Sequence, residues 1–246
     1  MSLLLRISFF FTAFALALSA NGSAAKTHFQ TGIKAYENGD DEAAATAFTM
    51  AVQAEETSAA RHNLGLTYLQ LDQSAQAVWQ LERALLLDPF NRSYREKLNR
   101  IRNQLGLSPG AQKWYIQLSQ IVTFKLWVRV ATLSFWLLLA LLILPRLNQR
   151  KAGSRIKLLS LLSSLILVLS LTAIWLNLKT LKSGTVLSEE IIALHAAPAT
   201  AAPESGFARP GERAHVIDQH NDFYKIKTEG AATGWLSKTD FYPLAD

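Results

Sequence analysis

The five histidines are the side chains best suited to catalysis or metal binding: His28, His62, His195, His215 and His220. None of them belongs to an H-E-x-x-H motif, no serine lies in G-x-S-x-G, and the chain has no glycine-rich phosphate loop. It also has no cysteine, which excludes thiol nucleophiles, cysteine-based metal sites and disulfides. We therefore expect a protein that is not an enzyme and that needs neither a cofactor nor a metal.

One histidine pair is close to acidic residues in the sequence. His215 and His220 lie near Asp218 and Asp222, and such a group could hold a metal ion. The same residues also fit a solvated hairpin, because the polar "HND" turn separates two alternating apolar stretches. We expect the hairpin.

The chain before residue 110 contains an internal repeat. Residues 31–52 align with residues 64–85 at a constant shift of 33, which matches Gly32 with Gly65 and pairs Phe48 with Leu81. Small residues at such positions let two antiparallel helices approach closely, and the bulky residue fills the gap between them. The pattern predicts two helix pairs.

A further helix is predicted after the second repeat. Pro89 ends that repeat, and residues 91–107 carry apolar side chains on one face and many charged ones on the other. This pattern is typical of a helix that caps a repeat array.

The repeated residues resemble the tetratricopeptide repeat, whose consensus positions are occupied here by Gly65, Tyr68, Ala77, Leu81, Ala84 and Pro89. The first repeat departs from the family because it has Glu56 where proline is expected. Two repeats are marginal in isolation, so we expect the capping helix, the membrane or a partner to complete a domain spanning residues 26–107.

The resemblance implies a protein-binding groove along the first helix of each pair. The residues carried over to it are Tyr36, His62, Asn63 and Leu66, together with Phe29, Ile33 and Leu69. Asn63 is the sharpest candidate, because a side-chain amide can both donate to and accept from a peptide backbone. The alternative is that the apolar members pack against neighbouring helices.

The positive charge of the chain is concentrated in one part of it. Residues 111–182 contain ten Lys and Arg and no acidic residue, whereas residues 26–110 and 183–246 are neutral or acidic. A net charge of +6 therefore does not indicate a nucleic-acid partner.

Two apolar stretches lie in this basic part, at residues 124–144 and 158–178, and each is near the ~20 residues that cross a bilayer. Between them, residues 145–157 carry five basic side chains, which favours a cytoplasmic loop. Residues 1–25 read as a secretory signal peptide, with cleavage after Ala20, Ala24 or Ala25. Both cues place the regions before and after the hairpin outside the cytoplasm.

After residue 183 the pattern changes to short alternating stretches, "RAHVIDQ", "FYKIKT" and "TGWLSK", which predict β-strands. The order of "PGE", "FYKI" and "GWL" resembles the bacterial SH3-like domain, over residues 184–246. Tyr224 and Trp235 could form a ligand surface, although Trp235 could equally close the core of the barrel.

The order of all these parts resembles the BatE family of bacterial aerotolerance-type operons. The fold expected is multidomain: all-α tetratricopeptide repeats, a two-helix transmembrane hairpin and a small all-β SH3-like barrel. The resemblance implies an inner-membrane scaffold with both soluble parts in the periplasm. The implied partners are von Willebrand-type Bat proteins, a BatD-like protein and a MoxR-type ATPase. The alternative is a cell-wall sensor or targeting module whose C-terminal domain binds peptidoglycan.

Overall fold

The computed structural model describes residues 23–108, 124–147 and 153–244. The chain divides into two compact units. The first combines Met1–Gly110 with Gly184–Leu244, so it is built from the two ends of the sequence, and the second contains Ala111–Ser183. The predicted signal peptide, except for residues 23–25, and the centre of the predicted basic loop lie outside the described residues.

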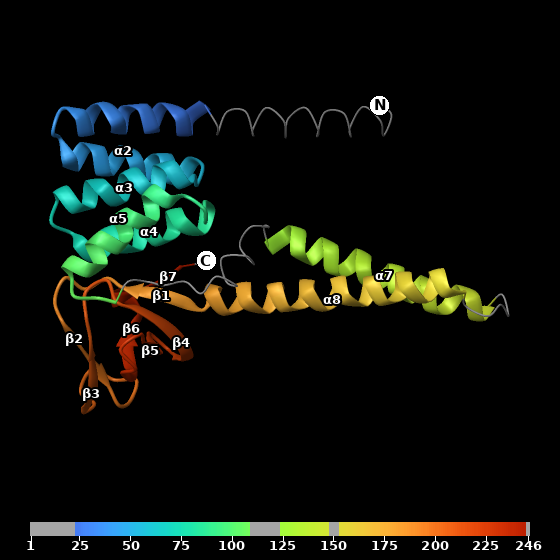
Figure 1. Cartoon of the computed structure of the whole chain (residues 1–246). Coiled ribbons are helices and arrows are strands. Elements are labelled where there is room, and N and C mark those ends of the chain that lie inside the picture. The colour runs from blue at the N-terminus through green and yellow to red at the C-terminus, as the bar shows by residue number, and fades with distance from the viewer. Residues whose placement is uncertain (1–22, 109–123, 148–152, 245–246) are drawn as a thin grey trace, which may run out of the picture. The chain divides into compact units, whose positions relative to one another are not determined.

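Five helices form the N-terminal region of the first unit, and Figure 1 shows them stacked on one another. They span residues 23–37, α2 (Asp41–Ala54), α3 (Ser58–Gln70), α4 (Ser74–Leu87) and α5 (Arg92–Gln104).

Side chains at the N-caps fix where three of these helices begin. Asp40, Thr57 and Asn91 each accept a hydrogen bond from a backbone N–H in the first turn of the helix that follows. Two turns need left-handed backbone, at Gly39 (φ 75°) and Asp72 (φ 58°), the two residue types that tolerate it best.

The helices pair through glycines that face bulky side chains. A Cβ atom on Gly32 would lie 2.7 Å from the ring of Phe48, and one on Gly65 would lie 3.0 Å from Cγ of Leu81. In both cases the partner lies sixteen residues further along the chain. The two helix pairs therefore have the same close approach, and Phe48 and Leu81 are fully buried at it.

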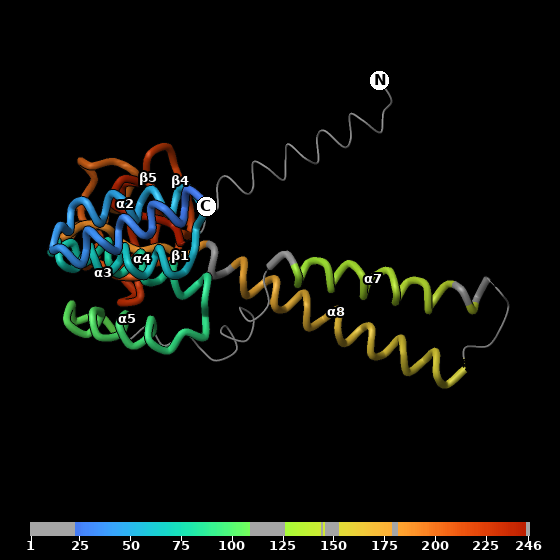
Figure 2. Tube along the Cα trace, turned by 90° about the horizontal axis from the view of Figure 1, so that it is seen from above, coloured from blue at the N-terminus to red at the C-terminus, as the bar shows by residue number. Residues whose placement is uncertain are grey.

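The second unit consists of two long apolar helices, α7 (Phe124–Leu147) and α8 (Ser154–Leu181), which lie side by side in Figures 1 and 2. The hydroxyl of Ser163 donates a buried hydrogen bond of 2.9 Å to the carbonyl of Ser134 on the other helix. Each helix contains a stretch long and apolar enough to cross a membrane, Leu126–Ile143 and Ser154–Leu178. Their large apolar side chains are mostly exposed, as a lipid environment would require.

The C-terminal part of the first unit is a seven-stranded antiparallel sheet with strand order β3-β2-β6-β5-β4-β1-β7. Its strands are β1 (Ser183–Val186), β2 (Ile192–His195), β3 (Glu204–Ala208), β4 (Arg213–His220), β5 (Phe223–Thr228), β6 (Thr233–Ser237) and β7 (Phe241–Pro243). The fully buried side chains of Val186, Leu194, Ile226 and Leu236 form the centre of its core.

Candidate functional site

The first predicted groove residue, Tyr36, packs within the helical region. Its ring is half-buried against a cluster that includes Phe48 and Leu64, and its hydroxyl accepts a hydrogen bond of 3.4 Å from Gln70 of α3. Tyr36 therefore joins the first helix to α3 and presents only part of its surface.

Phe29 and Ile33 also lie on the first helix and pack against the same cluster, whereas the other predicted groove residues lie on α3. The ring of His62 stacks on that of Tyr94 of α5, with centroids 4.1 Å apart, and its buried Nε2 has no hydrogen-bond partner in the part of the chain that the structure describes. Burial, and secondarily the charge of Lys97, lowers the pKa of His62. The amide of Asn63 donates to the carbonyl of Ala59 in its own helix (2.9 Å). Leu66, one turn after His62, is half-buried.

The corresponding face of α5 is open. Glu96 and Arg100 lie thirty-four residues after His62 and Leu66, just as the buried Leu98 lies thirty-four residues after the buried Leu64. On α5 these positions are exposed to solvent. Aligning the sequence of α3 with that of α5 at a shift of thirty-four residues predicts this face.

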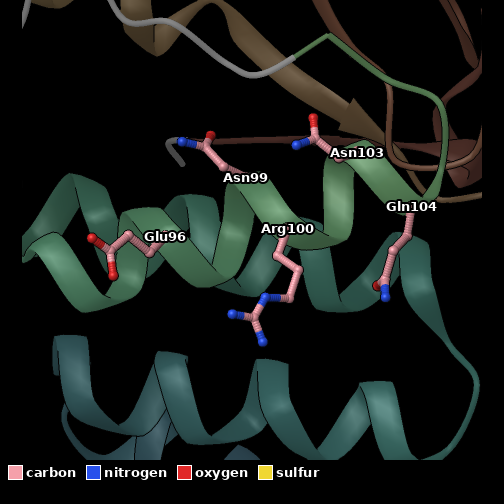
Figure 3. Close-up of a pocket in the computed structure, with 5 residues that line it drawn as sticks. All are labelled: Glu96, Asn99, Arg100, Asn103 and Gln104. Carbon is pink, nitrogen blue, oxygen red and sulfur yellow. The ribbon is translucent and has the colours of Figure 1, made fainter.

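A cavity of about 550 Å³ lies on this face and is lined by Glu96, Asn99, Arg100, Asn103 and Gln104. Figure 3 shows Asn99 and Asn103 pointing to one side of the helix and Arg100 and Gln104 to the other. Glu96 pairs with the exposed Arg92 at 2.9 Å, whereas no ion pair joins Arg100 to any other described residue. Each side of the helix therefore offers carboxamide groups that can bind a peptide backbone, and the guanidinium of Arg100 can bind a carboxylate on its own side.

Buried charges join the helical region to the β-sheet, which lies next to α4 and α5 in Figure 1. Glu82 of α4 pairs with Arg102 of α5 at 3.0 Å and with Arg213 of β4 at 2.8 Å. It also accepts a hydrogen bond of 2.8 Å from the hydroxyl of Thr185 in β1. Arg102 completes the network with a short ion pair to Glu229, after β5. Each side chain therefore depends on a partner from another element.

The last strand is held against α4 by side chains of the second helix pair. Trp79 donates its indole N–H to the carbonyl of Pro243 (3.1 Å), and its ring meets that of Tyr242 edge-on. Arg83 donates to the carbonyl of Leu244 and pairs with Glu56 at 2.5 Å. Glu56, which replaces the consensus proline of the repeat, thus accepts hydrogen bonds from Arg83, the residue that also contacts Leu244.

The β-sheet part also caps α4. The N-cap residue of this helix, Gln73, makes no side-chain capping bond. Instead, the carboxylate of Glu189 lies near the backbone N–H groups of Ser74 and Ala75, which partly oppose the rise that burial causes in its pKa. A carboxylate at this end also interacts favourably with the helix dipole. The helical and β-sheet parts therefore form one structural body, which we call the head.

The two candidates of the β-sheet part face opposite sides of the sheet. Tyr224 pairs with the buried Leu236, packs against the core and meets the ring of Phe241 edge-on. Trp235 is next to Leu236 and therefore points to the other face, where Lys225 lies over its ring. Trp235 is only 9% exposed. Tyr224 and Trp235 thus do not share one surface.

The histidine pair of the sequence lies on the β4–β5 hairpin. His220 precedes the turn at Asn221, which has left-handed backbone (φ 46°), and pairs with Phe223. Across the three described ranges, no group of three or more His, Asp or Glu side chains is arranged to hold a metal ion. His215 and His220 lie on a hairpin that is exposed along most of its length.

Comparison with known protein families identifies the class of the C-terminal part. Residues 192–241 match the family model described as a bacterial SH3 domain. The match begins at β2 and ends at the start of β7, so the C-terminal sheet contains a bacterial SH3 domain, which β1 extends. The match does not reach the helical region or the two apolar helices. No curated protein matches the chain.

Proposed function

We propose that this chain is a non-enzymatic scaffold of the bacterial inner membrane that binds partner proteins through its head. The observation that supports this most is the joining of the helical region and the SH3 domain by buried bonds, beside an open, amide-rich face of α5. Such a head offers surfaces on which partner proteins can bind.

The helical region is proposed to consist of tetratricopeptide repeats. The support is the repeated approach of Gly32 to Phe48 and of Gly65 to Leu81, at equal separation along the chain. In that family the first helix of each pair lines the binding groove. The α5 helix occupies the position that the first helix of a third repeat would have, so its open face forms the end of that groove.

The composition of the head limits the possible membrane topologies. It is assembled from the chain before α7 and the chain after α8. If both helices cross the membrane, the two outer ends of the hairpin must open on the same side, because the head needs both segments. The basic stretch between the helices then lies on the opposite side, which the charge rule makes the cytoplasm. The head is therefore periplasmic in this proposal, and residues 1–25 would direct its export.

The order of parts supports a role in a BatE-type aerotolerance or stress complex. In that case the proteins bound by the head are other inner-membrane components, such as von Willebrand-type Bat proteins. The α7–α8 hairpin would keep the head at the membrane surface, where such partners are anchored.

Co-purification from detergent-solubilised membranes tests the scaffold. The tagged wild-type chain should retain a defined set of membrane proteins that the Arg100→Ala/Asn103→Ala variant loses. The matched control is Lys34→Ala/Gln53→Ala, which removes the same two kinds of exposed side chain elsewhere on the helical region. An identical set of proteins from all three chains would contradict a partner site on α5.

The bacterial SH3 match favours a second candidate, a cell-wall sensor or targeting module. This function predicts that the full-length chain, in detergent, sediments with purified peptidoglycan and that the α5 variant sediments equally well. Sedimentation without any co-purifying membrane protein would replace the scaffold proposal with this one.

A further inference from the structure

A groove lies where the end of the helical region meets the SH3 domain. Its cavity has a volume of about 480 Å³. One wall comes from residues 106–108, directly after α5, and the others come from β3 and from the segments before β2 and after β5. Both parts of the head are therefore needed to form it. We call it the junction groove.

Two large apolar side chains line the groove and remain exposed. Ile191 is 66% exposed and Phe207 is 58% exposed. The register pairs Ala193 with Phe207 and Ile192 with the buried Ala208, so Phe207 points away from the core, and β3 is an edge strand. Large apolar side chains placed together on an outer surface mark a contact site for another molecule.

One residue that lines the groove has a buried polar atom without a partner among the described residues. Thr228 is only 4% exposed, and its buried hydroxyl makes no hydrogen bond within the described residues. A buried hydroxyl without a partner costs stability, and a ligand that supplied a donor or acceptor would remove that cost.

The side chains that line the groove include more carboxylates than guanidiniums. Two carboxylates, of Glu212 and Glu229, line it together with one guanidinium, of Arg209. Both oxygens of Glu212 accept backbone N–H groups, whereas Glu229 has one oxygen paired with Arg102 and makes no hydrogen bond through the other within the described residues. Burial raises the pKa of Glu229 even though Arg102 and Arg213 oppose this effect. An additional positive charge beside Glu229 would therefore be favourable.

We propose that the junction groove binds an extended segment of a partner protein that combines apolar and basic side chains. An apolar side chain packs on Ile191 and Phe207, a lysine or arginine side chain approaches Glu229, and a polar group of the segment bonds the hydroxyl of Thr228. This goes beyond the proposed function, which places partner binding on the outer face of α5. It gives the head a second surface with different chemistry.

Fluorescence anisotropy with defined peptides tests this site. The probe is a short fluorescent peptide of alternating leucine and lysine, and the protein is the full chain in zwitterionic nanodiscs, with empty nanodiscs as the blank. Peptides of the same length with glutamate for lysine, or serine for leucine, are the ligand controls. We expect the leucine–lysine peptide to bind about tenfold more tightly than either control.

Variants locate the binding in the groove. Phe207→Ser/Ile191→Ser should weaken binding of the leucine–lysine peptide about tenfold. Glu229→Gln, which keeps the shape of the side chain, should weaken it severalfold and remove the preference over the leucine–glutamate peptide. Phe207→Ser alone changes one exposed side chain outside the buried network of Glu82 and Arg102, and it keeps the test valid if either of these variants fails to fold.

Three results would overturn the proposal: equal affinity for all three peptides, unchanged affinity in both groove variants, or an equal loss in Arg100→Ala/Asn103→Ala. The last variant also separates this inference from the proposed function. One combination of results is a loss of the membrane proteins in co-purification with Arg100→Ala/Asn103→Ala and no binding of the leucine–lysine peptide by the wild-type chain. That combination would support the scaffold function and contradict binding in the junction groove.

Discussion

Glu82 and Arg102 form a salt bridge of 3.0 Å in which neither side chain is exposed to solvent. The two residues come from successive helices, and each also contacts the SH3 domain: Glu82 pairs with Arg213, and Arg102 pairs with Glu229. Buried ions are costly to remove from water, and only complete pairing offsets that cost. The network is therefore specific for one arrangement of helices and sheet.

Removing one member of this pair should destabilise the head strongly. We expect Glu82→Ala to lower the free energy of unfolding by about 3–5 kcal/mol, because it leaves Arg102 buried with less compensation. Urea titration of the detergent-solubilised chain, followed by tryptophan fluorescence, measures this.

The control for this prediction is Glu96→Ala, which breaks an exposed pair with Arg92 on the same helical region. We expect a change below about 1 kcal/mol. Similar losses in the two variants would mean that the buried network has no special role.

The close approach of the helix pairs makes Gly32 sensitive to substitution. Gly32→Ala would place Cβ 2.7 Å from the ring of Phe48, so the first helix or the ring must move. We expect a loss of about 1–3 kcal/mol in the same titration.

Gly153→Ala is the control, because no described residue has an atom within 4 Å of the added Cβ. Its effect should stay within about 0.5 kcal/mol. A neutral Gly32→Ala would show that the helices are packed less closely than described.

The stability of the helical region should fall in mild acid because of His62. Its folded-state pKa is lowered, by burial first and by Lys97 second, so the unfolded chain binds a proton more readily. The contribution of the neutral ring is complete above its ordinary value of 6.5 and is lost as the pH falls toward the folded-state pKa.

Thermal unfolding from neutral to mildly acidic pH measures this effect. His62→Phe, which keeps a ring against Tyr94, should lose less stability than the wild type over the same interval. His220→Phe, on the exposed end of the β4–β5 hairpin, should follow the wild type. Identical pH profiles for all three chains would rule out His62 as the source.

The absence of cysteine gives a clean test of topology. Single cysteines at Ser93 and Glu204, both exposed in the head, should react with a membrane-impermeant maleimide once the outer membrane is opened. A cysteine at Gln149, in the basic stretch, should react only after the inner membrane is also permeabilised. Labelling of Ser93→Cys and Glu204→Cys under different conditions would contradict a head on one side of the membrane.

Much of the helical region and both apolar helices could be predicted from the sequence, because apolar periodicity and the glycine spacing are local signals. The predicted terminal helix, residues 91–107, corresponds to α5 at Arg92–Gln104. The spacing of Gly32 and Gly65 located the helix contacts, because a side chain at either position would crowd Phe48 or Leu81.

The junction could not be predicted, because its residues carry no local signal of burial. Arg102 lies in a strongly charged helix, which indicates a solvated face, yet it is completely buried by Glu82 and Glu229 from distant parts of the chain. Strands β1, β2, β3 and β7 were also missed, since they are short and β2 and β3 flank an Ala- and Pro-rich loop. The placement of Tyr224 and Trp235 on opposite faces of the sheet could not be predicted either, because it depends on how β5 and β6 pair.

Hydrogen–deuterium exchange of the full chain in detergent tests most directly whether the helical region and the SH3 domain act as one head. Comparing the wild type with Glu82→Ala, the account predicts faster exchange in α5 and also in β1 and β4, while α2 is unchanged. Faster exchange confined to α4 and α5, with β1 and β4 as protected as in the wild type, would show that the two parts are independent and would contradict the account.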